Sequence, residues 1–258
     1  MSQAQTPING RLDGDQEPSA SNGLGRRRHP RSTGGRVADQ ESRTMTFQYL
    51  SVGDIAVILP GATTVFRRHK IDFCCNGGAL LSSEAERRGL DLSALETELR
   101  SLGTPGIAAP AETADLVAHI IERYHKVHRV EFPEAIRLAR RVETVHQAKA
   151  DCPRGLAELL TLMYDDLEDH QHKEEAVLFP AMVHGGSPTL RYPVALMMEE
   201  HVELGEQLAF MGDLTDDFTP PQGACTTWRA LYAACSKLDS DLREHIHLEN
   251  NLLFQRFI

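Results

Sequence analysis

Four long stretches between residues 113 and 258 place apolar residues at alternating spacings of three and four, which is typical of helices that bury one edge in a bundle. Loops rich in Gly and Pro ("CPRG", "HGGSP", "TPPQG") separate these stretches. The pattern predicts an all-α fold, with an antiparallel four-helix bundle over residues 113–258. The expected core positions are Ala114, Ala118, Ile121, His125, His128 and Phe132; Leu156, Leu160, Met163, Leu167, His170, Glu174, Val177 and Ala181; Val194, Met197, His201, Leu204, Leu208 and Met211; Trp228, Leu231, Cys235, Leu238, Leu242, His245, Glu249 and Leu252.

Each stretch is interrupted at one level by imidazole or carboxylate side chains. The second and fourth stretches carry His-x-x-x-Glu, which puts both groups on one helix face. The other two stretches supply one candidate ligand each, because His128, one turn from His125, is expected to be a core residue or to support a ligand. Burying unpaired carboxylates costs several kcal/mol, so the core must compensate for them. A hydrogen-bonded His–Glu network without metal would explain any single histidine, but six groups in register favour a metal centre. The candidate ligands are His125, His170, Glu174, His201, His245 and Glu249.

The two His-x-x-x-Glu segments are copies of one motif. "DLEDHQHKEEAVLF" and "DLREHIHLENNLLF" share the pattern D-L-x-[DE]-H-x-H-x-E-x-x-x-L-F. A pseudo-twofold bundle would bring ligands to the centre from both halves, which predicts two metal ions. If both glutamates bridge, each metal receives two imidazole nitrogens and two carboxylate oxygens, with a bridging oxo or hydroxo group as a fifth ligand. Mixed imidazole and carboxylate ligation favours iron over zinc and leaves one position open.

The neighbours of these residues are expected to have other roles. His172 and His247 are expected to face solvent. Asp166 and Asp241 are expected either to orient a ligating imidazole or to lie on a solvated face. Glu200 is a candidate to line an access path to the metal.

Residues 45–103 are predicted to form a small helical domain, and the Gly- and Pro-rich residues 104–112 a linker. Within the small domain, Gly89 is an expected helix C-cap, and Ser93 with Glu96 an expected capping box. The segment "IDFCCNGG" contains Cys74 and Cys75, for which a strained vicinal disulfide is not expected. They are either small residues at a turn or a thiol pair that relays electrons, accepts metal or reacts with a small oxidant.

Composition sets further limits. Residues 1–44 are rich in Gly, Ser, Pro and Arg and are predicted to be a disordered tail; a mitochondrial presequence fits less well because the tail contains acids, and Met45 is an alternative start. The formal net charge of −10 argues against nucleic acid, and no apolar run suggests a membrane span or a secretion signal. Five cysteines do not suggest a disulfide framework, so a reducing cytoplasm is expected. A homodimer remains an option, because small bundles often pair.

The segments "IDFCCNGG", "RYH", "DHQHKEEAVLFP", "EEH" and "EHIHLE" resemble the repair-of-iron-centres family over residues 46–258. The resemblance implies a cytoplasmic di-iron protein with a hemerythrin-like domain that restores iron–sulfur clusters damaged by nitric oxide or oxidative stress. The family's six ligand positions fall on the six candidates above, and its cysteine pair on Cys74 and Cys75. Oxygen-carrying hemerythrins use five histidines, so one fewer here argues against oxygen storage.

Three functions follow as hypotheses. The first is donation of iron from a labile di-iron centre to damaged iron–sulfur proteins, with Cys74 and Cys75 as transfer thiols. The second is enzymatic, the reduction of nitric oxide at the two metals. The third is a binding module that senses oxygen or nitric oxide.

Overall fold

The computed structural model describes residues 46–102 and 110–258. The predicted disordered tail and most of the predicted linker lie outside these residues. Within them the chain is helical, and the sole β-type pairing is an isolated bridge between Ser51 and Leu80. No helix in these described ranges is long and apolar enough to cross a membrane. The predicted all-α class is confirmed.

The bundle consists of four rods, and π-helical segments interrupt three of them. The first rod comprises α5 (Thr113–Ile120), η2 (Ile121–His125) and α6 (Lys126–His146). The second comprises α7 (Leu156–Lys173), η3 (Glu174–Leu178) and α8 (Phe179–Val183). After η4 (Pro188–Leu190), the third rod is the single helix α9 (Arg191–Leu214). The fourth comprises α10 (Thr226–His247), η5 (Leu248–Leu253) and η6 (Phe254–Arg256).

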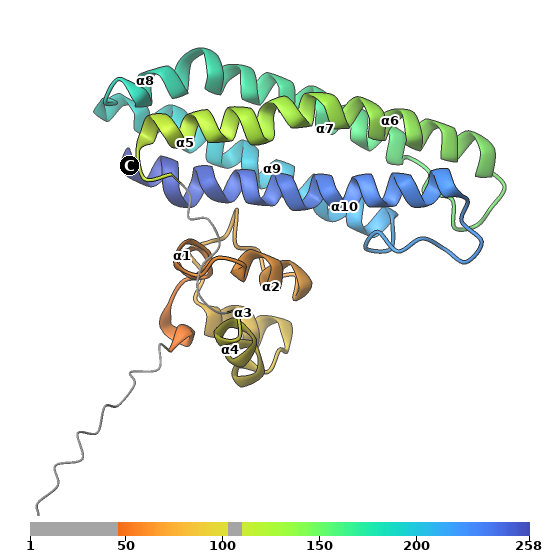
Figure 1. Ribbon diagram of the computed structural model, residues 1–258, viewed down its shortest axis with the longest axis horizontal. Helices are drawn as coiled ribbons and strands as arrows, with labels where there is room; N and C mark the ends of the chain where they lie inside the picture. The colour runs from red at the N-terminus through yellow and green to blue at the C-terminus, as the bar shows by residue number, and fades with distance from the viewer. Residues whose placement is uncertain (1–45, 103–109) are drawn as a thin grey trace, which may run out of the picture. The chain divides into compact units, whose positions relative to one another are not determined.

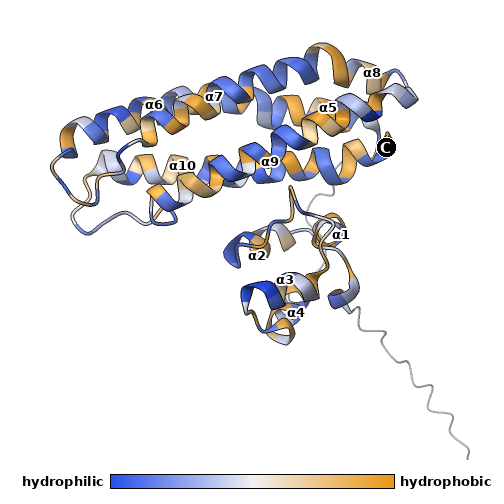
Figure 2. Cartoon of the chain, turned by 180° about the vertical axis from the view of Figure 1, so that it is seen from behind, coloured by the Kyte–Doolittle hydropathy of each residue, from blue (hydrophilic) through white to orange (hydrophobic). Residues whose placement is uncertain are grey.

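The rods run up and down in chain order and close into a ring. Contacts join α6 to α7, α7 to α9, α9 to α10 and α10 back to α6 (Figure 1). Hydrophilic and hydrophobic residues alternate along each rod in Figure 2, as expected for helices that bury one stripe. This arrangement is the predicted antiparallel four-helix bundle.

The π-helical segments shift the buried edge of three rods. In α9, which has no such segment, every expected core residue from Val194 to Met211 is buried. In the second rod, by contrast, Val177 is 67% exposed and Leu178 is buried, because the wider turn from Glu174 onward moves the edge by one residue. The predicted core positions Ala114 and Ala118 are exposed, and Ala181 and Leu252 are only partly buried at the edge of the core. The residues that take their places are Leu116, Val117, Met182 and Leu253.

Two apolar clusters fill the bundle, one at each end. The first contains Leu116, Phe179 and Phe254, and the second contains Phe132, Leu160 and Trp228 among others. In the first three rods the candidate ligands lie between the residues of the two clusters, and in the fourth rod His245 and Glu249 lie where one cluster gives way to the other. The bundle therefore has an apolar cluster on each side of one polar level.

The small helical region packs four short helices and a 3-10 turn into the second of these clusters. Its elements are η1 (Phe47–Tyr49), α1 (Val52–Ile58), α2 (Ala62–Arg68), α3 (Leu81–Arg88) and α4 (Leu92–Arg100). Gly89 ends α3 in the left-handed conformation, as predicted. The predicted Ser93–Glu96 capping box is wrong. Asp91 caps α4 instead, because its carboxylate accepts the amides of Ser93 and Ala94.

Candidate metal centre

The structure brings all six candidate residues to one place in the bundle core. Their side chains form two groups of possible donors, within each of which the ligand atoms lie within 4.8 Å of one another. All six are buried, each at most 5% exposed. The first group is His125, Glu174, His245 and Glu249, and the second is His170, Glu174, His201 and Glu249.

Each glutamate turns one oxygen toward each group. Glu249 Oε1 is 2.9 Å from His245 Nε2, and Glu249 Oε2 is 3.2 Å from His201 Nε2. Glu174 Oε2 is 3.6 Å from His125 Nε2, and Glu174 Oε1 is 3.4 Å from His170 Nε2. Both carboxylates are thus shared between two sets of paired imidazoles, which is the arrangement of a bridging ligand.

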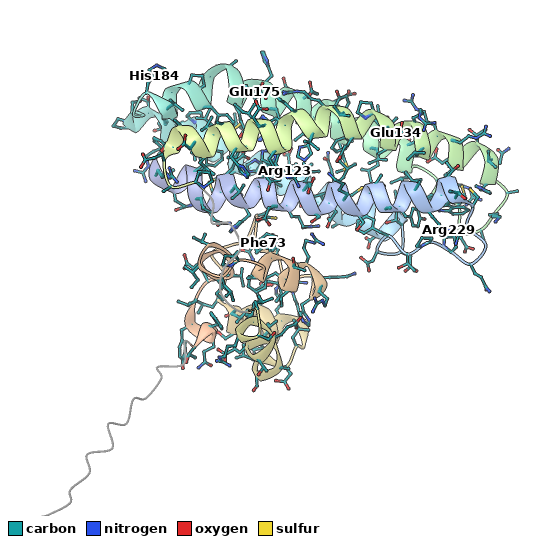
Figure 3. All side chains as sticks on the ribbon, viewed as in Figure 1. Phe73, Arg123, Glu134, Glu175, His184 and Arg229 are labelled. Carbon is teal, nitrogen blue, oxygen red and sulfur yellow. The ribbon has the colours of Figure 1, made fainter. Side chains whose placement is uncertain are left out.

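The paired imidazoles point the same nitrogen at each other. The Nε2 atoms of His125 and His245 are 3.0 Å apart, as are those of His170 and His201. For three of these rings the other nitrogen, Nδ1, faces an oxygen acceptor: Glu175 (labelled in Figure 3) for His125, Glu200 for His170 and Asn250 for His201. In neutral rings of His170 and His201 Nδ1 then carries the proton, so their two Nε2 lone pairs face each other. A proton or a cation between these two nitrogens would remove the repulsion.

The residues that orient the histidines follow the internal repeat. Glu175 and Asn250 each come directly after a shared glutamate, and each binds the histidine of the preceding rod. The repeat breaks at the residue before each of those histidines. Glu200 accepts from His170, whereas the equivalent Tyr124 stacks on His245 with ring centroids 5.5 Å apart. Within the described residues, Nδ1 of His245 therefore has no hydrogen-bond partner.

Charges inside the site stabilise one another. Burial opposes protonation of His170, but the negative charge of Glu174 and the hydrogen bond to Glu200 outweigh it and raise the pKa to about 10. Burial likewise opposes ionisation of Glu249, yet His245, His125 and His201 hold its pKa well below the usual value. The carboxylates thus demand positive charge at the core. Bound cations would supply the charge that protons on these imidazoles otherwise provide.

Comparison with known proteins agrees with this geometry. Residues 116–257 match the hemerythrin HHE cation binding domain family, and residues 49–103 match a domain of unknown function, DUF542. The chain is 44% identical over 216 residues to the iron-sulfur cluster repair protein YtfE of Dickeya chrysanthemi. The matched region covers 82% of this chain and 98% of the relative. The YtfE proteins of Edwardsiella ictaluri and Yersinia pestis are 45% and 43% identical, with the same coverage. This chain belongs to the iron-sulfur cluster repair protein family.

The side chains at this site are also chemically suited to bind a cation, independently of the comparison with relatives. Both oxygens of Glu174 and Oε2 of Glu249 are buried without a hydrogen-bond partner among the described residues. Such orphaned carboxylate oxygens are costly in a dry core. Carboxylate and imidazole together are ligands that iron and manganese accept. The observation that carries the metal assignment is therefore three unpaired anionic oxygens facing four imidazoles.

Several expectations for the neighbouring residues are corrected. His247, expected in solvent, is buried against the ring edge of Phe73, whereas His172 is exposed as predicted. Neither aspartate orients an imidazole. Asp241 is buried and accepts from Arg123 and Lys237, and Asp166 is exposed and accepts from Gln207.

Two orienting residues, Glu175 and Asn250, were missed from sequence. Both occupy the position after a shared glutamate in the repeated motif, and this equivalence was the signal that could have found them. Their types differ, so a search for identical residues in the repeat passes over them.

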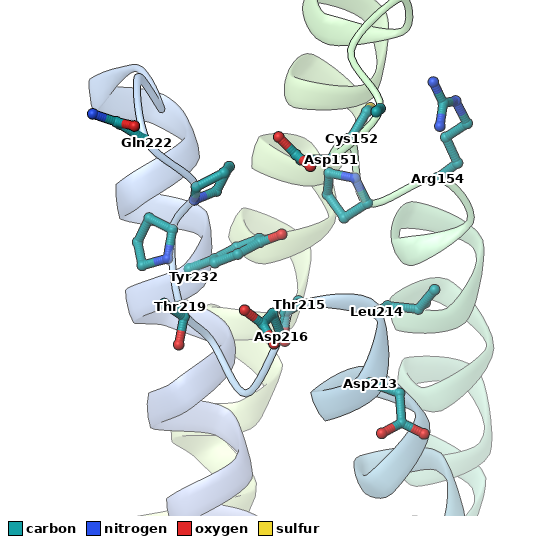
Figure 4. A pocket seen from close by; sticks show the side chains of 14 residues that line it. Asp151, Cys152, Arg154, Asp213, Leu214, Thr215, Asp216, Thr219, Gln222 and Tyr232 are labelled. Atoms are coloured by element: carbon teal, nitrogen blue, oxygen red, sulfur yellow. The ribbon is translucent and has the colours of Figure 1, made fainter.

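One pocket lies beside the polar level and another at the loop end of the bundle. One of about 380 Å³ is lined by Glu200, His170 and His201 together with Asp169 and Glu203, so it reaches one half of the polar level. Glu200 thus lines an opening to the site, as predicted. The other, of about 730 Å³, lies between the loops at 150–154 and 213–222 and contains none of the six residues (Figure 4).

Replacing Asn250 by Ala is expected to lower metal affinity by about 10–100-fold, because it removes the acceptor that fixes the Nδ1–H tautomer of His201. The measurement is competitive titration of Fe(II) against a chelator under anaerobic conditions. The matched control is Asn251→Ala. Asn251 donates to Phe73 O and contacts His247, so it makes a similar link without touching a candidate ligand. Equal losses in both variants would contradict the orienting role.

Proposed function

We propose that this protein repairs damaged iron–sulfur clusters by holding two iron ions in the bundle and donating iron to the damaged protein. Its relatives are named iron-sulfur cluster repair proteins, and its bundle belongs to a cation binding family. The observation that carries the proposal is that Glu174 and Glu249 each turn one oxygen to each imidazole pair. Two neighbouring cations are the species that such a shared arrangement accommodates.

The donor set supports release as well as binding. Each position would receive two imidazole nitrogens and two carboxylate oxygens from His125, His170, Glu174, His201, His245 and Glu249, with no thiolate among them. Iron held in this way supplies a redox-active Lewis acid. The six side chains provide two negative charges, which is less than two divalent ions carry. A site without thiolate ligands and with this deficit of negative charge favours the release of iron.

A route for iron is open on one side of the site. The pocket beside His170 and His201 is lined by Asp165, Asp166 and Asp169 as well as the carboxylates already named. Carboxylates along this opening attract a cation on its way to or from the site. Lys173 lies at the same opening and binds Glu200 and Asp169, so it offsets part of the negative charge.

The position of the cysteine pair supports a role for it in receiving iron. Cys75 Sγ is 3.2 Å from the backbone oxygen of His201, and Asn250 joins Cys74 O to the His201 ring. We expect the Cys74→Ser/Cys75→Ser variant to keep its bundle iron but to repair clusters about tenfold more slowly, the lower end of what loss of a group beside metal ligands costs. The measurement is the recovery of activity of a nitric oxide-damaged iron–sulfur dehydratase.

The control for this prediction is Cys225→Ser, which removes a half-buried thiol in the loop before α10. It should repair at the unaltered rate. A double variant that repairs as fast as this control would remove the hand-over role from Cys74 and Cys75.

Reduction of nitric oxide is the second candidate function. The pocket that reaches His170 and His201 would admit a diatomic gas to that half of the site. Anaerobic single-turnover gas analysis of the reduced protein separates the two functions. Formation of nitrous oxide supports the enzyme, and its absence with cluster repair intact supports iron donation.

The experiment that tests the main proposal combines metal analysis and Mössbauer spectroscopy on anaerobically purified protein with the dehydratase repair assay. Two coupled irons per chain that decrease as the dehydratase recovers are the expected result. Recovery without loss of iron would overturn iron donation.

A further inference from the structure

A further group of donor atoms lies in the loop before α3, outside the six residues of the bundle. A carboxylate oxygen of Asp72 and the sulfurs of Cys74 and Cys75 all lie within 4.8 Å of one another. The two sulfurs are 3.6 Å apart, and Cys74 Sγ is 3.4 Å from Asp72 Oδ1. Neither cysteine forms a disulfide.

These separations match one tetrahedral metal ion. With metal–sulfur bonds of about 2.3 Å, two thiolates on a tetrahedral ion lie about 3.8 Å apart. With a metal–oxygen bond of about 2.0 Å, a thiolate and a carboxylate oxygen lie about 3.5 Å apart. We propose that Asp72, Cys74 and Cys75 bind a single thiophilic divalent cation such as Fe(II), Zn(II) or Co(II), at a position separate from the bundle site.

The loop is held in this shape by partners on the bundle. Asn250 donates to Cys74 O, and Asn251 donates to Phe73 O. The Cys75 amide donates to Asp72 Oδ1, which aims the carboxylate at the cysteine pair. These three contacts come from the chain itself and hold the donors of Asp72, Cys74 and Cys75 close together, which lowers the ordering cost of binding a cation.

Gly205 provides the space in which the Cys75 thiol lies. Gly205 belongs to α9, one turn after His201, and a Cβ built there would be 3.1 Å from Cys75 Sγ. Any larger residue would push the sulfur away from α9. The missing side chain therefore lets the cysteine loop approach the helix that carries His201.

Charge and access both favour a cation in this loop. Two thiolates and a carboxylate exceed the charge of a divalent ion by one, and the partly buried Arg243 interacts electrostatically with both Cys74 and Asp72. A pocket of about 870 Å³ is lined by Asp72, Cys75, Gly205 and Arg243. A cation can therefore reach the loop without passing through the bundle core.

The binding site stands on this geometry, whereas its role as the acceptor of iron from the bundle rests on the proposed function. Iron that leaves the His170–His201 side would meet soft ligands next to the same helix. Metal binding and cluster repair can be measured separately, so failure of one is distinguishable from failure of the other.

The test is anaerobic titration of Co(II) into the reduced, full-length, iron-loaded protein, followed by absorption spectroscopy. One Co(II) per chain should bind with a thiolate-to-metal charge-transfer band, which the bundle site cannot produce because it has no sulfur ligand. Cys75→Ser should remove most of this band. Asp72→Asn keeps the acceptor for the Cys75 amide and should lower Co(II) affinity by at least about tenfold with the band retained.

A glycine pair gives the matched control. Gly205→Ala should weaken Co(II) binding, whereas Gly212→Ala on the same helix should not, because its Cβ meets only Asp217 Oδ1 at an ordinary 3.5 Å. Absence of the charge-transfer band overturns the proposal. Wild-type affinity in Asp72→Asn, or equal affinity in the two glycine variants, also counts against it.

Discussion

The Glu174→Gln variant is expected to purify with almost no bound metal, whereas His245→Gln should keep about half of the wild-type content. Glu174 turns its two oxygens to different imidazole pairs, so its loss would remove one anionic ligand from each of the two proposed metal positions. His245 belongs to one group of donors only. A neutral amide cannot replace a bridging carboxylate, because it lacks the charge and one of the two acceptor oxygens.

The measurement is metal content by mass spectrometry after anaerobic purification. The matched control is Glu175→Gln, one residue further along. Glu175 accepts from His125 and Arg129 and lies in neither donor group, so we expect only the 10–100-fold loss of affinity typical of an orienting residue, about as for Asn250. Wild-type metal content in Glu174→Gln would show that its carboxylate is not shared between two metals.

Removal of metal is expected to lower the stability of the bundle by about 4 kcal/mol, the linkage expected when free metal stands at about a thousand times Kd. For a chain of this size the loss corresponds to a melting temperature lower by about 8–16 °C. The physical source is the polar level itself. Without a cation, the buried carboxylates of Glu174 and Glu249 rely on protonated imidazoles for their compensation.

The measurement is thermal unfolding followed by circular dichroism, with and without a strong chelator. The Glu174→Gln/Glu249→Gln variant serves as the control, because it removes both buried charges together with the metal ligands. We expect its melting temperature to be insensitive to chelator and to lie above that of the metal-free wild type. A wild-type protein that melts at the same temperature with and without chelator would show that metal does not stabilise the bundle.

The internal repeat explains why the ligand candidates were accessible from the sequence while their partners were not. His170 and Glu174 occupy positions at which the buried edge of a bundled helix normally carries an apolar residue such as Leu, and His245 and Glu249 depart from the pattern in the same way. The three- and four-residue spacing of apolar residues along one helix is enough to reveal polar residues at core positions. Glu175 and Asn250 bear on histidines in other rods, so no spacing within their own rod indicates what they bind.

The sequence by itself determined the all-α class, the four rods and the single polar level, because each depends on periodicity along one helix. Tertiary structure alone decided where that periodicity breaks. The π-helical turns at Glu174 and around Glu249 add a residue that no local pattern reveals, and they leave Val177 outside and Leu178 inside. Packing between segments also buried His247 against Phe73 and brought Cys75 to Gly205, since such contacts depend on which surfaces meet.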